Sequence, residues 1–443
     1  MTKLTFLEKA AYGFGDLASN LIFNAVTTYL MFYYTDSVGI SAATASTLFL
    51  VSRLWDAVSD PMMGAIGDRT RTRWGKFRPY LLFVPVPFAV VAVMTYTSPD
   101  FSMTGKIIWA FVTYLLLMTL YTAVNIPYGS MAAAITRDSH ERAQLTTYRM
   151  IFAFAGGMLL NAIMMPLVNW YAGDADNKIA GYQFAVAVLA VLSVILYWLC
   201  FAFTRERVND EPEVAPQLAA EFKTVLKTRA WWTLLAMGTL MFALAIFPFY
   251  AGMYFLKYVF LNESFASTYF TTLTTGMLFG ALVNLVLVRF INQRTLAMVA
   301  GIWGAVFSLT AMMVEPGQSM LLAAFGFLGF MGTGMGAPNL WAMVADTADH
   351  IENTTGRRIA GLTTAAVSFS MKFGLGVGGS AVGYILAYVG FEANVEASND
   401  VQSAIRMMVS VFPAVGYVLF ALAAWTFPIK NKAYSHEAAA AGI

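Results

Sequence analysis

The sequence predicts an all-α integral membrane protein with twelve transmembrane helices. Of its 443 residues, 59% are hydrophobic and only 12% are charged, whereas a soluble domain has about 45–50% apolar and about 25% charged residues. The apolar residues form continuous runs, such as residues 107–129, that are long enough to cross a hydrocarbon core about 30 Å thick as a helix. These runs do not alternate in polarity as the strands of a membrane β-barrel do.

The apolar runs divide the chain into two sets of six. The predicted spans are 11–35, 45–67, 79–98, 106–129, 146–170, 181–203, 231–256, 267–289, 295–314, 319–345, 360–389 and 403–427. We therefore expect an N-terminal six-helix half at 1–203, a cytoplasmic middle loop at 204–230, a C-terminal six-helix half at 231–427 and a cytoplasmic tail at 428–443. The first span is longer than the apolar part of a cleaved signal peptide, and further spans follow it.

The lysines and arginines predict the orientation of the spans. With both termini in the cytoplasm, twenty of the 27 fall in the termini and loops that face inward. Lys106, Lys178, Lys257 and Arg406 face outward, and the other three lie inside spans. This excess agrees with the positive-inside rule. It predicts a multi-pass protein of the inner (plasma) membrane with both termini cytoplasmic.

Two sets of six spans joined by a long loop are the layout of the major facilitator superfamily. In that fold the two halves are related by an axis along the membrane normal, and the substrate site lies near the midplane. The layout therefore directs attention to polar residues inside the spans.

The span 45–67 carries three charged residues in its middle. Arg53, Asp56 and Asp60 are spaced by three and four residues, which places them on one face of a helix. A charge at the centre of a membrane helix costs about 2.5–3.5 kcal/mol and commonly marks an ion or substrate pathway. Two carboxylates one turn apart predict a site for a hard cation or a shared proton. The other interpretation is that Arg53 neutralises one aspartate in a structural ion pair.

Other polar residues also fall inside apolar spans. Lys372 needs a partner across the bundle, and Asp56 or Asp60 is the natural candidate. The other interpretation is that Lys372 is a structural counter-ion. Arg149 offers a planar fork of donors to sugar hydroxyls or a carboxylate, unless it snorkels to the membrane surface. Asn20 and Asn125 can bond a neighbouring helix or a hydroxylated ligand. The glycines of 374–383 indicate close helix packing rather than a phosphate loop.

An enzyme is not expected, and neither is a catalytic residue. The spans hold no nucleophile–base pair and no histidine, and the chain has no HExxH motif. The single cysteine, Cys200, allows no disulfide within one chain and no zinc spacing. We expect no cofactor and no nucleic-acid partner, but a monomeric chain surrounded by membrane lipid.

Six segments carry a family likeness. They are AYGFGDLASN, YLMFYYTDSVGI, RLWDAVSDPMMGAIGDRTRTRWGKFRP, YTAVNIPYG, MVADTADH and SMKFGLGVGG, which run from residue 11 to about residue 383. In these segments the chain resembles the glycoside–pentoside–hexuronide:cation symporters, the melibiose-permease-like branch of the major facilitator superfamily. The third segment is the most specific, with its paired aspartates and tryptophan–glycine–lysine loop. The pattern GFGDLASN is closer to the glucuronide and pentoside members than to melibiose permease itself.

The resemblance implies a cation site. Asp56 and Asp60 match the aspartates that bind the coupling cation, and they would be the metal ligands if that cation is Na+. Thr122 matches a threonine that completes the site, and Ser59 stands where the melibiose-type members have an asparagine.

The resemblance also implies a sugar site and a gate. Arg149 matches a sugar-contacting arginine, and Lys372 a lysine close to both sites. Asn20 and Asn125 stand where melibiose-type members have aspartates, while Gly129 and Ser19 replace a tryptophan and a lysine. The further substrate-binding candidates are Asp16, Tyr128 and Ser368. The gating candidates are Arg69, Arg73 and Lys76 of the basic loop, expected to pair with Asp346, Asp349 or Glu352 when the inner side is closed.

These replacements lead to a hypothesis about the substrate. Two acids become neutral amides while Arg149 and Lys372 remain, so the site should be more positive and favour an anionic sugar. We expect symport, coupled to Na+ or H+, of a hexuronide or uronate-containing oligosaccharide by alternating access. The alternatives are a neutral pentoside or xyloside symporter, a passive facilitator of the same fold, and a sodium-dependent lysolipid transporter of related fold.

Overall fold

The structure is a computed structural model that describes residues 4–173, 178–208, 218–355 and 360–429. The described residues form helices joined by loops, and their one extended pairing is an isolated bridge between Thr72 and Gly75. The helices form two compact units, Met1–Glu213 with Glu392–Val395, and Val214–Phe391 with Glu396–Ile443.

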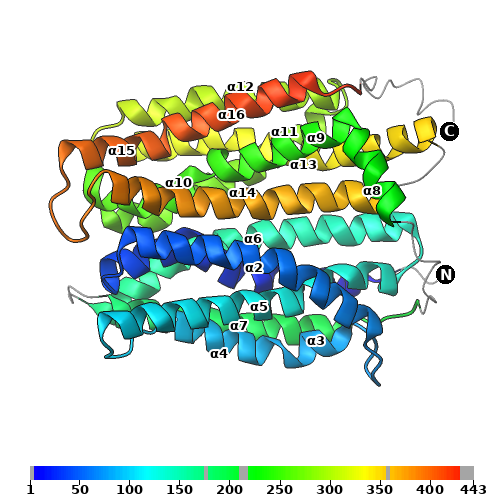
Figure 1. The fold of residues 1–443 in the computed structure, drawn as a ribbon, viewed down its shortest axis with the longest axis horizontal. Coiled ribbons are helices and arrows are strands. Elements are labelled where there is room, and N and C mark those ends of the chain that lie inside the picture. The colour runs from blue at the N-terminus through cyan, green and yellow to red at the C-terminus, as the bar shows by residue number, and fades with distance from the viewer. Residues whose placement is uncertain (1–3, 174–177, 209–217, 356–359, 430–443) are drawn as a thin grey trace. The chain divides into compact units, whose positions relative to one another are not determined.

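The first unit contains seven α-helices within the described residues (Figure 1). They are α1 (Phe6–Ala25), α2 (Ala42–Arg69), α3 (Arg78–Phe83), α4 (Pro85–Thr95), α5 (Met103–Ile135), α6 (Ser139–Ala172) and α7 (Ile179–Phe203). α1 leads into two π-helical segments, Val26–Leu30 and Tyr33–Ser37. It packs against α6 and α7, whereas α2 packs against α5.

The predicted span 79–98 is divided between α3 and α4. The break falls at Val84, directly before Pro85. Proline has no backbone N–H and its ring clashes with the preceding turn, so it begins a new helix rather than continuing the old one. Both short helices lie along α7 (Figure 1).

The second unit contains nine α-helices within the described residues. They are α8 (Leu218–Lys227), α9 (Arg229–Leu240), α10 (Phe247–Tyr254), α11 (Ala266–Leu287), α12 (Gln293–Thr310), α13 (Ser319–Thr355), α14 (Ala360–Tyr388), α15 (Asn399–Val409) and α16 (Val411–Thr426). Two π-helical segments, Met241–Ala245 and Phe255–Val259, connect the helices around α10. α8 lies inside the predicted middle loop, where Val225 packs with Trp231, Ile351 and Ala366.

Eight helical stretches of the described chain are long and apolar enough to cross a membrane. They are Met103–Ile135, Gln144–Ala172, Ile179–Phe203, Arg229–Val259, Glu263–Leu287, Gln293–Met313, Ser319–Thr355 and Asn399–Thr426. The remaining predicted spans also fall on helices. The span 45–67 is less apolar than these eight because α2 carries three charged residues in its middle.

Helices of the second unit pack closely at glycines. A Cβ atom on Gly334 of α13 would lie 1.9 Å from the carbonyl oxygen of Met277 on α11, and one on Gly378 of α14 would lie 2.4 Å from the carbonyl oxygen of Ala243. No side chain fits at such distances, so the two backbones approach each other only because glycine is present. The glycines of 374–383 therefore serve helix packing, as the sequence indicates.

The first long helical stretch of each unit ends in the same way. A π-helical segment is followed by a residue with positive φ, Gly39 at +83° in the first unit and Leu261 at +57° in the second. On either side of it, backbone N–H groups donate to carbonyls five and six residues earlier. Glycine adopts this left-handed conformation readily and leucine rarely. The two units thus share one type of helix ending, formed by different residues.

Candidate functional site

A buried ion pair lies inside the first unit, between α1 and α6. Nε and Nη2 of Arg149 donate to the two carboxylate oxygens of Asp16 at 2.5 and 3.4 Å. The exposed fractions of the side chains are 10% for Asp16 and 22% for Arg149. A guanidinium and a carboxylate joined by two parallel hydrogen bonds form a strong and geometrically specific pair. The arginine therefore does not simply extend to the membrane surface.

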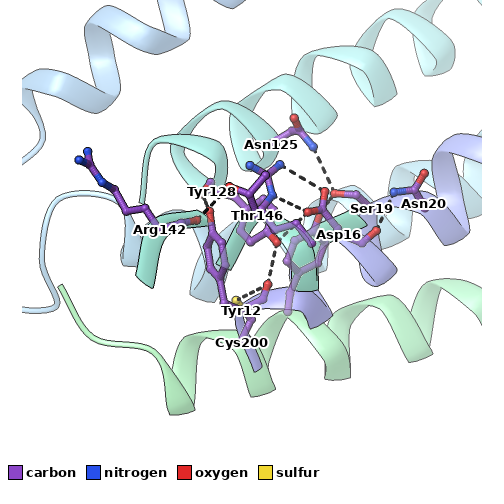
Figure 2. A network of polar contacts seen from close by, with 11 residues as sticks. Tyr12, Asp16, Ser19, Asn20, Asn125, Tyr128, Arg142, Thr146 and Cys200 are labelled. Carbon is purple, nitrogen blue, oxygen red and sulfur yellow. Dashed lines mark hydrogen bonds and ion pairs between the residues drawn. The ribbon is translucent and has the colours of Figure 1, made fainter. Parts of the chain in front are cut away.

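Two tyrosines surround this ion pair (Figure 2). The Tyr128 hydroxyl lies 3.0 Å from the Asp16 carboxylate and 2.7 Å from the Tyr12 carbonyl, so it can donate to either. The Tyr12 hydroxyl donates to the Tyr128 carbonyl at 3.2 Å. The Arg149 guanidinium lies 4.8 Å from the centre of the Tyr128 ring, within the range of a cation–π interaction. Gly15 leaves room for that ring, because a Cβ there would lie 2.3 Å from it.

A second set of hydrogen bonds adjoins the ion pair. Ser19 shares a hydrogen bond of 2.5 Å with Tyr197 of α7, and it accepts a longer one of 3.4 Å from the side-chain amide of Asn125. Asn20 donates to the backbone carbonyl of Asp16 at 2.8 Å. Five predicted substrate-binding residues are therefore brought into one cluster from α1, α5 and α6, here called the Asp16 cluster: Asp16, Asn20, Asn125, Tyr128 and Arg149.

The acidic residues of α2 form a separate group. Arg53 donates to Asp56 at 3.0 Å, so the ion pair considered from the sequence is present. Thr122 of α5 donates to Asp60 at 3.0 Å. The Ser59 hydroxyl is buried and makes no hydrogen bond to the described residues. Carboxylate and hydroxyl oxygens are the ligands that hard cations prefer. We call Asp56, Ser59, Asp60 and Thr122 the α2–α5 oxygen group.

Histidine and cysteine do not contribute to this group. Within the described residues, no three or more His, Cys, Asp or Glu side chains come together as a metal site would require. A cation held by the α2–α5 oxygen group would therefore depend on two carboxylates and two hydroxyls. These groups can hold a hard cation or share a proton.

Five of the other predicted residues lie in the second unit. Lys372 and Ser368 are on α14, where Lys372 is half-buried and Ser368 exposed. α13 continues to Thr355, so the three acidic gating candidates lie in its last turns and not in a loop: Asp346, Asp349 and Glu352. Their pairing with the basic loop stays a prediction, as does the pairing of Lys372 with an aspartate of α2.

The basic loop between α2 and α3 is held by an acid that sequence reasoning missed. The Glu206 carboxylate, just after α7, accepts the backbone N–H groups of Lys76, Phe77 and Arg78 at 2.8, 2.7 and 2.9 Å. Gly75 has φ of +112°, and a Cβ there would lie 2.7 Å from that carboxylate. An isolated acid in the basic segment 204–208 was the available signal.

The gating candidates of that loop differ in exposure. Arg69 and Arg73 are exposed, and Arg73 stacks on Trp74 with its guanidinium 4.1 Å from the ring centre. Lys76 is half-buried, and its ammonium group lies 4.8 Å from the centre of the Phe77 ring. Tyr12 and Tyr197 were also missed, since aromatic residues make up 15% of the chain and no pattern distinguishes these two.

Eight helical stretches of membrane length in the described residues, together with buried ion pairs on α1, α2 and α6, are typical of a multi-span membrane transporter. The family model for MFS/sugar transport protein matches residues 11–431. The chain therefore belongs to this family of membrane transporters, whose members are not enzymes.

Curated relatives match nearly the whole chain. The inner membrane symporter YicJ of Escherichia coli is 38% identical over 95% of this chain and 91% of its own length. The isoprimeverose transporter of Lactiplantibacillus pentosus is 35% identical over 94% and 87%. The glucuronide carrier protein homolog of Escherichia coli is 31% identical over 98% and 94%. The resemblance to glycoside/cation symporters is thereby confirmed.

A solved structure shows the same fold. The crystal structure of a D-xylose-proton symporter superposes with a TM-score of 0.68 and covers 95% of this chain and 97% of its own. Its sequence identity is 15%, so this likeness shows the major facilitator fold and nothing finer.

Proposed function

We propose that this chain is a secondary active transporter that moves a glycoside together with Na+ or H+. One observation carries the proposal: the α2–α5 oxygen group and the Asp16 cluster are formed within the same unit. The first offers oxygen ligands to a cation, and the second offers donors and acceptors to sugar hydroxyls. The symporters among its relatives support this assignment.

The proposal includes the complete topology. Twelve transmembrane helices would form two six-helix halves, 1–203 and 231–427, joined by a cytoplasmic loop at 204–230 and followed by a cytoplasmic tail at 428–443. The chain would be a monomer in the inner membrane with both termini in the cytoplasm. The excess of inward-facing lysine and arginine supports this orientation.

The proposed mechanism is alternating access. A cation bound by Asp56, Ser59, Asp60 and Thr122 lowers the local negative potential and raises the affinity for sugar. By linkage, sugar then raises the affinity for the cation by the same factor. Sugar contacts are assigned to the Asp16 cluster with Lys372 and Ser368. The gate is assigned to Arg69, Arg73 and Lys76 with the acids Asp346, Asp349 and Glu352.

Two classes of sugar are candidates. The first is a hexuronide or uronate-containing oligosaccharide, which agrees with the name of the glucuronide carrier homolog. The second is a neutral pentoside or xyloside, which agrees with the name of the isoprimeverose transporter. Arg149 and Lys372 favour the first class if both cations are available to the substrate.

Uptake into right-side-out membrane vesicles tests the proposal. Labelled glucuronide, xyloside and galactoside are supplied in turn, with sodium and pH gradients imposed separately. We expect one class of sugar to accumulate against its gradient when one ion gradient is imposed. If no sugar accumulates under either gradient, the proposal is wrong, and uptake of a labelled lysolipid becomes the next measurement.

A further inference from the structure

We infer that Trp55 is a positioning residue that sets the register of α2 against α5 and so holds the α2–α5 oxygen group in shape. The inference rests on the proposed function and concerns how its cation site is kept in place. Its basis is a hydrogen bond between the two helices, in which the indole N–H of Trp55 donates to the Thr119 hydroxyl at 2.8 Å. Trp55 itself is assigned no contact with the cation.

The direction of this hydrogen bond is unambiguous. An indole has one N–H donor and no acceptor, so the Thr119 hydroxyl must accept. That hydroxyl gives its own hydrogen to the Leu115 carbonyl at 2.8 Å, which fixes its orientation. With 41% of its surface exposed, Trp55 is not held in place by burial alone. The hydrogen bond therefore contributes to the position of the indole and joins α2 to α5.

The depth of Trp55 in its span is unusual for a tryptophan. Trp55 lies near the middle of the predicted span 45–67, whereas tryptophan in membrane proteins is enriched at the two interfaces with water. The hydrocarbon core offers no partner to an N–H group, so an indole at this depth needs a partner from the protein. Thr119 supplies that partner, and the position of Trp55 indicates a link between helices rather than an anchor at the membrane surface.

The link lies beside the α2–α5 oxygen group. Trp55 directly precedes Asp56 on α2, and Thr119 lies three residues before Thr122 on the same face of α5. Thr122 donates to Asp60, which makes a second hydrogen bond between the same two helices. At a rise of 1.5 Å per residue, the two bonds are separated by about 7.5 Å along α2 and about 4.5 Å along α5. Two bonds at different depths restrain both the sliding and the rotation of one helix against the other, which a single bond cannot do.

The oxygen group depends on the register between the two helices, because three of its residues lie on α2 and one on α5. A slip of one residue moves one helix by about 1.5 Å along the other, whereas a binding site must be held to within about 0.5 Å. Such a slip would break the contact of 3.0 Å between Thr122 and Asp60. Ser59 does not restrain the helices itself, because its buried hydroxyl makes no hydrogen bond to the described residues. The bond of Trp55, one turn before Ser59, supplies this restraint.

The experiment removes each partner of the bond and measures cation affinity directly. Trp55→Phe removes the indole N–H but keeps an aromatic ring, and Thr119→Val removes the hydroxyl but keeps the shape of the side chain. Sodium binding to the purified proteins is measured by calorimetric titration with NaCl, and proton binding by potentiometric titration. We expect each variant to bind the cation about 3- to 20-fold more weakly, a range that matches the strength of hydrogen bonds between membrane helices. Thr119→Ser keeps the acceptor, so its affinity should stay within about twofold of the wild-type value.

Two further comparisons separate positioning from a general loss of packing. The double variant W55F/T119V should be no weaker than the weaker single variant, because both substitutions break the same bond. Sugar exchange at saturating cation should keep its half-saturating sugar concentration within about twofold, since linkage restores full sugar affinity once the cation is bound. A loss of packing would instead lower cation affinity, sugar affinity and melting temperature together.

Matched controls make the same chemical changes away from the seam between α2 and α5. Trp170→Phe alters an exposed tryptophan of α6. Thr272→Val alters a hydroxyl that donates to the Thr268 carbonyl within α11, in the second unit. Both control variants should bind the cation as the wild-type protein does.

The outcomes separate this inference from the proposed function. An unchanged cation affinity in Trp55→Phe or in Thr119→Val overturns the inference, and so do additive losses in the double variant. An equal loss of sugar affinity at saturating cation also overturns it. If Trp55→Phe does not fold, the contrast between Thr119→Val and Thr119→Ser decides. Failure of the wild-type protein to accumulate any sugar would refute the proposed function alone, because cation binding by the purified variants is measured without transport. Binding of neither sodium nor a proton by the wild-type protein would refute both.

Discussion

The two units are built from the same type of helix, with the same ending after the first long stretch, but their interiors differ. In the first unit, helices are joined by buried ion pairs such as Asp16–Arg149 and Lys9–Glu141. In the second unit, helices approach at glycines such as Gly334, with a core of alanine, leucine and methionine around α9, α13 and α16. The first unit thus contains the Asp16 cluster and the α2–α5 oxygen group, and the second contains the shortest glycine contact to a helix backbone, at Gly334. Substitutions in the two units should therefore have different consequences.

The largest effect is expected on coupling, from Asp56→Asn in the first unit. The change removes one carboxylate from the α2–α5 oxygen group and with it the ion pair between that carboxylate and Arg53. Cation-driven accumulation should fall by about 5–150-fold, the usual range of coupling between two sites. Sugar exchange without a gradient should be affected less. Accumulation ratios under imposed sodium and pH gradients measure both.

The exposed acid Asp100 provides the control for this prediction. Asp100→Asn is the same chemical change in the same unit, at a site open to solvent. It should accumulate sugar like the wild-type protein. Uphill uptake retained in Asp56→Asn would show that the cation is bound elsewhere.

The second largest effect is expected on the stability of the folded protein. It is tested by comparing two glycine-to-alanine substitutions. Gly334→Ala places a methyl group 1.9 Å from a backbone oxygen, so α11 and α13 must separate. Such overpacking costs about 1–3 kcal/mol. Gly129→Ala in the first unit meets nothing within 4 Å and should change stability by about 0.5 kcal/mol or less. Melting temperatures of the purified proteins in detergent check this. Equal values for the two variants would contradict the contrast between the units.

The smallest effect is local and concerns Glu206. Glu206→Ala leaves the N–H groups of residues 76–78 without their acceptor. A hydrogen bond to a charged group contributes about 1.5–3 kcal/mol, and partial solvent access reduces this, so we expect amide exchange there to accelerate about tenfold. Hydrogen exchange resolved by mass spectrometry measures it. Glu206→Gln keeps one acceptor oxygen and should give an intermediate rate, while an unchanged rate in both variants would contradict the role of Glu206.

The sequence was sufficient for the fold class because membrane helices have a strong compositional signal. Continuous apolar runs and the distribution of lysine and arginine locate helices without tertiary information. The division of the predicted span 79–98 at Val84 was not predicted, although two prolines follow that residue closely. The π-helical segments could not be predicted, because a local change in backbone hydrogen bonding does not alter the hydrophobic periodicity of the sequence. The length of α13 was underestimated because its last turns are polar.

Within the site, a contact between residues close in the sequence could be predicted, whereas a contact between residues far apart in the sequence could not. The spacing of Arg53 and Asp56 placed both on one face of a helix, and they do form an ion pair. Asp16 and Arg149 are 133 positions apart, so no spacing rule connects them. Their pairing depends on how α1 packs against α6.

The same two ion pairs differ in when they can form during synthesis. Arg53 and Asp56 leave the ribosome together and can neutralise each other while α2 enters the membrane alone. The ion pair of Asp16 cannot form until Arg149, which is 133 residues later in the chain, has been synthesised. At about 5–20 residues per second this takes on the order of ten seconds. During that interval the nascent α1 carries a carboxyl group without its counter-ion, at an insertion cost of about 2.5–3.5 kcal/mol near the bilayer centre. We therefore expect stable placement of the first helix only after Arg149, in the fifth predicted span, has been made.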